Sequence, residues 1–111
     1  MFVDLSALLN RFSNPECIAG SCADYQSGAF EEPKEQEKDQ QEGKKIKVPT
    51  QVLFSASNLG KMHDVPAIWE KWVDGELKCH AIPDGYGHFL PEECPEIIAK
   101  HVIGWIDHVG K

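Results

Sequence analysis

The chain has 111 residues, 41% hydrophobic and 26% charged, which is the composition of a folded domain and not of a disordered chain. Its formal net charge of −7 argues against nucleic acid and anionic membranes as partners, because both require basic patches. No apolar run approaches the ~20 residues of a membrane span, and the N-terminus lacks the basic segment of a secretory signal, so we expect a cytoplasmic protein.

Two helices are predicted near the N-terminus. Residues 4–12 carry apolar side chains with the i, i+3, i+4, i+7 spacing of one helical stripe: Leu5, Leu8, Leu9 and Phe12. Asn14 is suited to cap a second helix whose first residue is Pro15, and that helix is expected to end near Ser27-Gly28.

The segment 31–45 is charged and polar, with no aliphatic or aromatic residue. It cannot contribute to a core, so it forms either a solvated helix or a flexible connection. We therefore expect it to be a linker between helices in 1–30 and an α/β region in 46–111.

A strand-helix-strand unit is predicted after this linker. Val52-Leu53-Phe54 is a continuous apolar run, typical of a strand buried on both faces, and Pro49 restricts regular pairing to the residues after it. A loop over 55–63 leads to Asp64, which is suited to cap a helix. The apolar face of that helix has the spacing i, i+3, i+4, i+7, i+8: Val65, Ile68, Trp69, Trp72 and Val73. The segment 76–82 is the second strand, so a parallel pair with a right-handed crossover is expected.

The loop after the second strand holds the candidate catalytic residue, His88. Gly85 and Gly87 allow a sharp turn there, and Pro91 and Pro95 are suited to the first positions of a helix. In open α/β sheets, ligands and catalytic groups collect at the carboxyl ends of strands. The sequence therefore predicts an imidazole at a functional position.

The last helix is predicted to turn one apolar face toward the sheet. The residues on that face are Ile98, Val102, Trp105, Ile106 and Val109. Lys100, Asp107 and Lys111 lie away from it, which is the pattern of an amphipathic helix that covers a sheet.

No metal or cofactor is expected. None of the four cysteines forms a C-x-x-C pair, so buried free thiols are the favoured interpretation for Cys17, Cys22, Cys79 and Cys94. The chain also has no glycine-rich loop of the kind that cradles a nucleotide.

Several pieces of the chain, taken together, carry a resemblance to a known family. Gly87-His88, four residues, Glu93, one residue and Pro95 form a pattern that resembles the catalytic-histidine segment of α/β-hydrolases. Other pieces match in order and spacing from about Asn14 to Val109: Cys22-Ala23-Asp24-Tyr25-Gln26-Ser27-Gly28-Ala29, Lys45-Ile46-Lys47-Val48-Pro49, and Asp64-Val65 with Trp69 and Trp72. The chain resembles the C-terminal third of this fold, with its best match in the fluoroacetate (haloacetate) dehalogenase branch and its epoxide-hydrolase relatives.

The resemblance implies a fold and a mechanism. The fold would be the C-terminal βαβα piece of an α/β-hydrolase, with a parallel strand pair preceded by helices of the cap domain. An aspartate would displace halide from a small haloacid and form an ester, and His88 would activate the water that hydrolyses it. Tyr25 lies where the family places a cap tyrosine that helps bind the leaving halide.

The chain departs from the family at the nucleophile. Neither Gly-x-Asp-x-Gly nor Gly-x-Ser-x-Gly occurs in it, and Phe54-Ser55 replaces a frequent Trp-Gly. We therefore expect a fragment that is inactive alone and acts on a small molecule only when a complementary N-terminal half is present. Epoxide hydrolase or esterase ancestry is one alternative. A non-catalytic fragment that pairs through an open strand edge, as a homo-oligomer or with another half, is the other.

Overall fold

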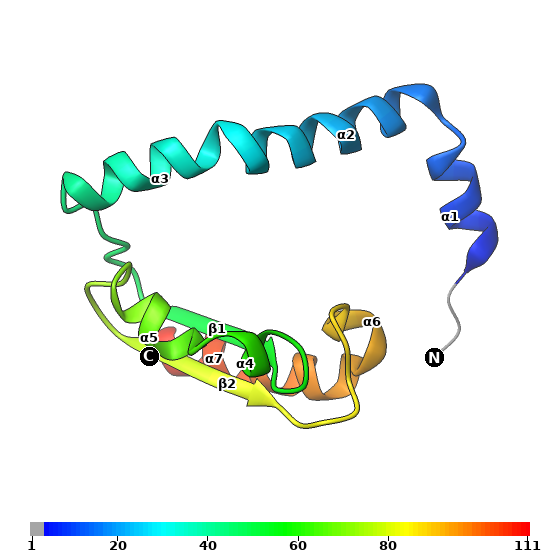
Figure 1. Ribbon diagram of the computed structural model, residues 1–111. Helices are drawn as coiled ribbons and strands as arrows, with labels where there is room; N and C mark the ends of the chain where they lie inside the picture. The colour runs from blue at the N-terminus through cyan, green and yellow to red at the C-terminus, as the bar shows by residue number, and fades with distance from the viewer. Residues whose placement is uncertain (1–3) are drawn as a thin grey trace. The chain divides into compact units, whose positions relative to one another are not determined.

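The computed structural model describes residues 4–111, and the chain divides into two compact units (Figure 1). One unit is helical and extends to Lys44, and the other, Lys45–Lys111, contains the strands. Within residues 4–111, no helix has both the length and the apolar character that crossing a membrane requires.

The helical unit begins with the two helices that the sequence predicts. α1 (Leu5–Phe12) is capped by Asp4, whose carboxylate accepts a hydrogen bond from a first-turn N–H at 3.1 Å. α2 (Pro15–Phe30) is capped by Asn14 in the same way, at 2.9 Å. α2 continues past the predicted end at Ser27-Gly28, because the carbonyl of Ser27 still accepts a helical hydrogen bond.

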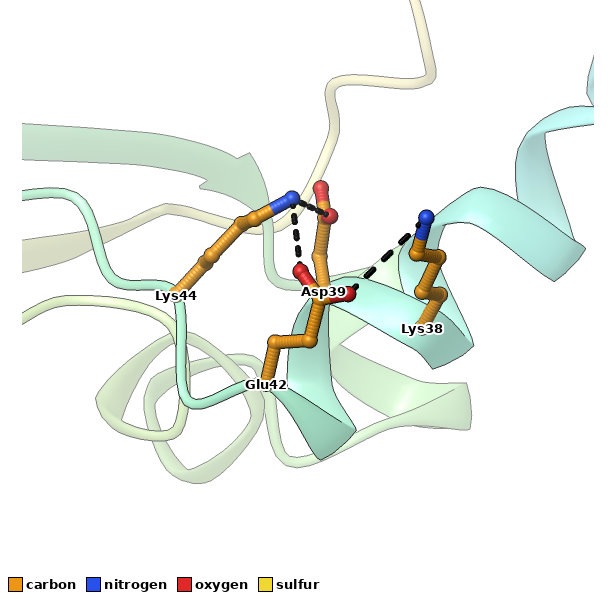
Figure 2. Close-up of polar contacts among 4 residues, drawn as sticks. All are labelled: Lys38, Asp39, Glu42 and Lys44. Carbon is orange, nitrogen blue, oxygen red and sulfur yellow. Dashed lines mark hydrogen bonds and ion pairs between the residues drawn. The ribbon is translucent and has the colours of Figure 1, made fainter.

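The charged segment forms a solvated helix, α3 (Glu32–Gln41), which is one of the two predicted alternatives. It is followed by Gly43, whose φ of 70° lies in the left-handed region that glycine adopts without strain. The N–H of Lys44 donates to the carbonyl of Asp39 at 2.9 Å. Figure 2 shows the Lys44 ammonium between Asp39 (2.6 Å) and Glu42 (3.0 Å), and hydrogen bonds with these carboxylates raise the pKa of Lys44. No residue within α1, α2 or α3 is buried, so these helices form no core among themselves.

The second unit contains a two-stranded parallel sheet and four helices. In chain order its elements are β1 (Thr50–Ser55), α4 (Leu59–Met62), α5 (Val65–Glu70), β2 (Leu77–Ile82), α6 (Leu90–Glu93) and α7 (Pro95–Val109). The register pairs Thr50 with Leu77 and Ser55 with Ile82. The predicted parallel pair is thus confirmed, and regular pairing begins directly after Pro49.

Two predicted boundaries in this unit are wrong. The expected loop over 55–63 contains the single helical turn α4. The helix expected to include Trp72 and Val73 ends before them, because Ile46 pairs with this segment. The N–H of Ile46 donates to the carbonyl of Trp72, and the N–H of Asp74 donates to the carbonyl of Ile46, both at 2.8 Å. Pairing with a residue distant in the sequence therefore ends α5.

Helices cover both faces of the sheet. Figure 1 shows α4 and α5 on the near face and α7 behind the strands. On the α5 face, Phe54, Val65 and Trp69 help line an apolar groove of about 290 Å³. On the other face, the side-chain amide of Gln51 donates to the carbonyl of His101 in α7 at 3.3 Å.

The core lies at the carboxyl end of the strands. Ile82 is fully buried, with 0% exposure, and clusters with Leu90 and Cys94. Ile97 and Ile98 of α7 pack against this cluster. The best-packed part of the unit therefore supports the loop between β2 and α6.

The predicted apolar face of α7 is only partly correct. Ile98 and Trp105 are half-buried, and His101 lies between them on the side facing the sheet. The other predicted members are exposed: Val102, Ile106 and Val109. A sheet of two strands is too narrow to cover the whole apolar stripe of a long helix. Part of the stripe is therefore left exposed to solvent within residues 4–111.

Candidate active site

His88 lies in the loop between β2 and α6, at the carboxyl end of the parallel pair, and its side chain is exposed. Gly85 gives this loop its turn, with a φ of 106° that favours glycine. Gly87, which is predicted to act in the same way, has no such φ among the described residues. The position of His88 agrees with the prediction, while its catalytic role stays a prediction.

The backbone on both sides of His88 is held by one carboxylate. Glu93 Oε1 accepts a hydrogen bond from the N–H of Gly87 at 2.9 Å, and Glu93 Oε2 accepts one from the N–H of Phe89 at 3.0 Å. A Cβ on residue 87 would lie 3.2 Å from each of these oxygens. A larger residue at position 87 would therefore have to displace the Glu93 carboxylate by a few tenths of an ångström, and the two hydrogen bonds hold the backbone on either side of His88.

A second set of hydrogen bonds joins the same loop to the end of β1. The carbonyl of Tyr86 accepts from the hydroxyl of Ser55 at 2.7 Å and from the hydroxyl of Ser57 at 2.8 Å. Ser55 is buried, with 4% exposure. A hydroxyl at this position thus does structural work that glycine could not do, because glycine has no side chain to donate.

The ring of His88 makes an edge contact with the neighbouring ring of Phe89, with 5.2 Å between centroids. Within residues 4–111, the imidazole that pairs with a carboxylate is that of His108, 2.6 Å from Glu76. No described carboxylate orients His88 in this way. The arrangement therefore offers an accessible proton acceptor on a fixed loop, to which an orienting acid and a nucleophile would have to be added.

Tyr25, the predicted halide-binding residue, lies on α2 and is 82% exposed. It borders a shallow depression together with Asp24, Gly28 and Glu32. Tyr25 and His88 belong to separate units, so the binding role of Tyr25 also stays a prediction.

The cysteines differ in their surroundings. All four are free, and Cys94 is buried while Cys22 is exposed, so the expectation that all are buried is wrong. Burial raises the pKa of the Cys94 thiol. Within residues 4–111, no three His, Cys, Asp or Glu side chains converge in a way that could hold a metal ion.

Sequence patterns do not indicate the supporting role of three residues at this loop: Ser55, Ser57 and Glu93. In the sequence, Glu93 appears only as part of the pattern that resembles the catalytic-histidine segment. The spacing of Gly87 and Glu93 was a usable signal, because a glycine beside a catalytic candidate often marks a close approach. The serines could not have been found, because their partner is far away in the sequence.

A parallel strand pair between helices, with an exposed histidine after the second strand, is a partial α/β fold. No protein-family model matches the chain. Epoxide hydrolase 3 from Mus musculus is 31% identical over 100 residues, which cover 89% of this chain and 25% of that protein. A solved structure of a protein provisionally assigned as an acyltransferase, from Salmonella enterica, matches with a TM-score of 0.75 and 27% identity. That match covers 86% of this chain and 31% of the other.

These likenesses support the broader part of the expected resemblance. The chain is similar to an epoxide hydrolase of the α/β-hydrolase class and to a solved structure that shares its partial α/β fold. Neither protein is a haloacetate dehalogenase, so that narrower branch is not established. The chain spans about a quarter to a third of the length of the two proteins it matches.

Proposed function

We propose that the unit Lys45–Lys111 supplies the general base, His88, of an epoxide-hydrolysing α/β-hydrolase centre whose nucleophile is supplied by other residues. The observation that carries the proposal is the exposed imidazole on a loop braced on both sides at the carboxyl end of a parallel pair. The similarity to mouse epoxide hydrolase 3 supplies the substrate class.

The chemistry assigns His88 to the second of two steps. A carboxylate outside this chain attacks an epoxide carbon, the C–O bond opens, and the epoxide oxygen takes a proton from an acid outside this chain to become a hydroxyl. The product is an ester between protein and substrate. His88 then takes a proton from water while the water oxygen attacks the ester carbonyl. As the ester C–O bond breaks, the departing oxygen takes that proton from His88, which releases the diol, and the carboxyl group returns its remaining proton to the acid used in the first step and becomes a carboxylate again.

The edge of β1 is the place where we expect the rest of the centre to join. Thr50 donates its N–H to the carbonyl of Glu76, directly before β2, and Ala56 donates its N–H to the carbonyl of Ile82, the last residue of β2. The backbone N–H and C=O groups of successive residues alternate between the two edges of a strand. Those of Gln51 and Leu53 therefore face the edge of β1 that lies away from β2. β1 carries no charge, whereas exposed edge strands are usually protected by charged residues. β1 therefore has the composition of an inner strand.

The test is a chimera in which this chain replaces the quarter of mouse epoxide hydrolase 3 that it matches. We expect the chimera to hydrolyse an epoxide such as styrene oxide, and we expect His88→Gln to lower kcat by at least about a hundredfold. His108→Gln, an exposed histidine at the end of α7, is the matched control. A folded chimera whose rate is the same with His88→Gln as with His108→Gln would contradict the role of His88.

Haloacetate dehalogenation is the narrower version of the same proposal, because it uses the same ester and the same base. In that version Tyr25, whose phenol is exposed, donates a hydrogen bond to the departing halide. Fluoride release from fluoroacetate by the chimera, reduced by Tyr25→Phe, would assign this substrate. Epoxide turnover without fluoride release would support the epoxide assignment and contradict haloacetate dehalogenation.

A second candidate function is a non-catalytic interaction module. It is favoured by the open β1 edge and by the exposed apolar side chains of α7, namely Val102, Ile103, Ile106 and Val109. These surfaces would pair with a second copy or with another half of an α/β core. Light scattering of the purified chain tests this: a dimer or larger species supports it, and a monodisperse folded monomer contradicts self-association.

A further inference from the structure

A groove between the sheet and α7 is separate from the His88 loop. It has a volume of about 450 Å³ and lies near the beginning of the strands, whereas His88 follows their end. Gln51, Lys78 and His80 line it from the strands, and Lys100, His101 and Trp105 line it from the helix. We call it the α7 groove.

The α7 groove is positive in a chain whose net charge is −7. Lys78 and Lys100 approach it from opposite walls. Lys100 has no carboxylate partner within residues 4–111, and Lys78 is 3.8 Å from Glu76, a long contact between exposed groups. The carboxylate of Glu76 is already engaged at 2.6 Å by His108. Within residues 4–111 the Lys100 ammonium is therefore unpaired, and the Lys78 ammonium is only partly offset by Glu76.

The floor of the groove is aromatic. The rings of His80 and His101 lie 4.6 Å apart at 37°. Trp105 lies beside them, and the Lys78 ammonium is 5.7 Å from the centroid of its ring. Burial lowers the pKa of His80, and the charges of His101 and Lys78 lower it further. A bound anion would offset the like charges that oppose protonation there.

Gly104 keeps the groove open. It lies in the middle of α7, where glycine weakens a helix, and a Cβ there would meet no atom within 4 Å. Packing therefore does not require glycine at this position. Gly104 lines the groove, and the missing side chain adds to its depth.

We infer that the α7 groove binds a small aromatic carboxylate. The carboxylate lies between Lys78 and Lys100, and the ring stacks on the aromatic floor formed by His101 and Trp105. This inference does not depend on the proposed hydrolase function, because it uses none of the residues of the His88 loop.

The experiment is an NMR titration of the full chain with benzoate, observed at the histidine ring protons and the indole N–H of Trp105. We expect saturable shifts at His80, His101 and Trp105. Benzamide, which has the same ring without the charge, and inorganic phosphate, which has charge without a ring, are each expected to bind several-fold more weakly. Linear, unsaturated shifts with benzoate would overturn the inference, and phosphate binding as tight as benzoate binding would overturn its aromatic part.

Variants separate binding from folding. Lys78→Gln and Lys100→Gln are each expected to weaken benzoate binding about fivefold, which corresponds to one ammonium at about 4 Å in water. Lys61→Gln, a surface lysine outside the groove, is the control and is expected to have no effect. Gly104→Leu fills the groove and is expected to abolish binding. Gly104→Ala strengthens the helix and is expected to weaken binding less, so unchanged affinity in both glycine variants would contradict the assignment.

Discussion

Removing the Glu93 carboxylate is expected to loosen the His88 loop without unfolding the unit. Glu93 holds the N–H groups of Gly87 and Phe89, which are the residues on either side of His88. The neighbouring Glu92 makes neither hydrogen bond, so Glu92→Ala is the matched control. Both changes remove one negative charge from the same turn of α6, which leaves the two hydrogen bonds as the difference between them.

The magnitude follows from the two bonds. A hydrogen bond to an ionised group contributes about 1.5–3 kcal/mol when it is well shielded. Glu93 is exposed, so solvent screening lowers this to about 1 kcal/mol per bond. Together the bonds contribute about 2 kcal/mol, which is a roughly 30-fold change in the equilibrium for loop opening.

Amide hydrogen exchange measures this change directly. In Glu93→Ala, the N–H groups of Gly87 and Phe89 are expected to exchange about 30-fold faster. The N–H of the core residue Ile82 is expected to exchange at the same rate as in the unsubstituted chain. Glu93→Gln retains one acceptor oxygen and is expected to give an intermediate rate. Equal exchange rates at residues 87 and 89 in Glu93→Ala and Glu92→Ala would refute the bracing role.

Three further results are expected. Asp64→Ala removes the acceptor of a first-turn N–H of α5, at 3.1 Å, and should lower the free energy of unfolding by about 1 kcal/mol, seen as a lower urea midpoint. Burial and positive neighbours lower the pKa of His80 in the folded state, so the unfolded state binds more protons. Stability should therefore fall as the pH drops below the ordinary histidine value of 6.5, and His80→Asn should reduce that loss in pH-dependent unfolding. Alkylation followed by peptide mass spectrometry should modify exposed Cys22 first and Cys94 last, because Cys94 is 3% exposed and burial raises its pKa; equal rates would contradict the packing.

Local signals in the sequence predicted much of the fold. Asn14 and Asp64 cap helices as expected, because capping involves only neighbouring backbone groups. Val52-Leu53-Phe54 indicated β1, because a continuous apolar run between turn-forming residues suits a strand covered on both faces. The position of His88 followed from the strand and the glycines around it.

Features that depend on distant contacts could not be predicted in this way. The end of α5 is set by Ile46, which pairs with the chain after the helix. Ser55 supports the His88 loop through the carbonyl of Tyr86, and nothing near Ser55 in the sequence indicates that partner. The apolar pattern of α7 predicted a wider buried face than two strands can cover, which is why Ile106 is exposed.

We propose above that His88 activates the water that hydrolyses a protein–substrate ester. Intact-mass spectrometry of the His88→Gln chimera with styrene oxide tests it most directly, since the ester should form but not turn over. We predict a persistent mass increase equal to one substrate molecule in His88→Gln, with little or none at steady state in the unsubstituted chimera. Continued diol formation by His88→Gln at the unsubstituted rate, without an adduct, would contradict the claim.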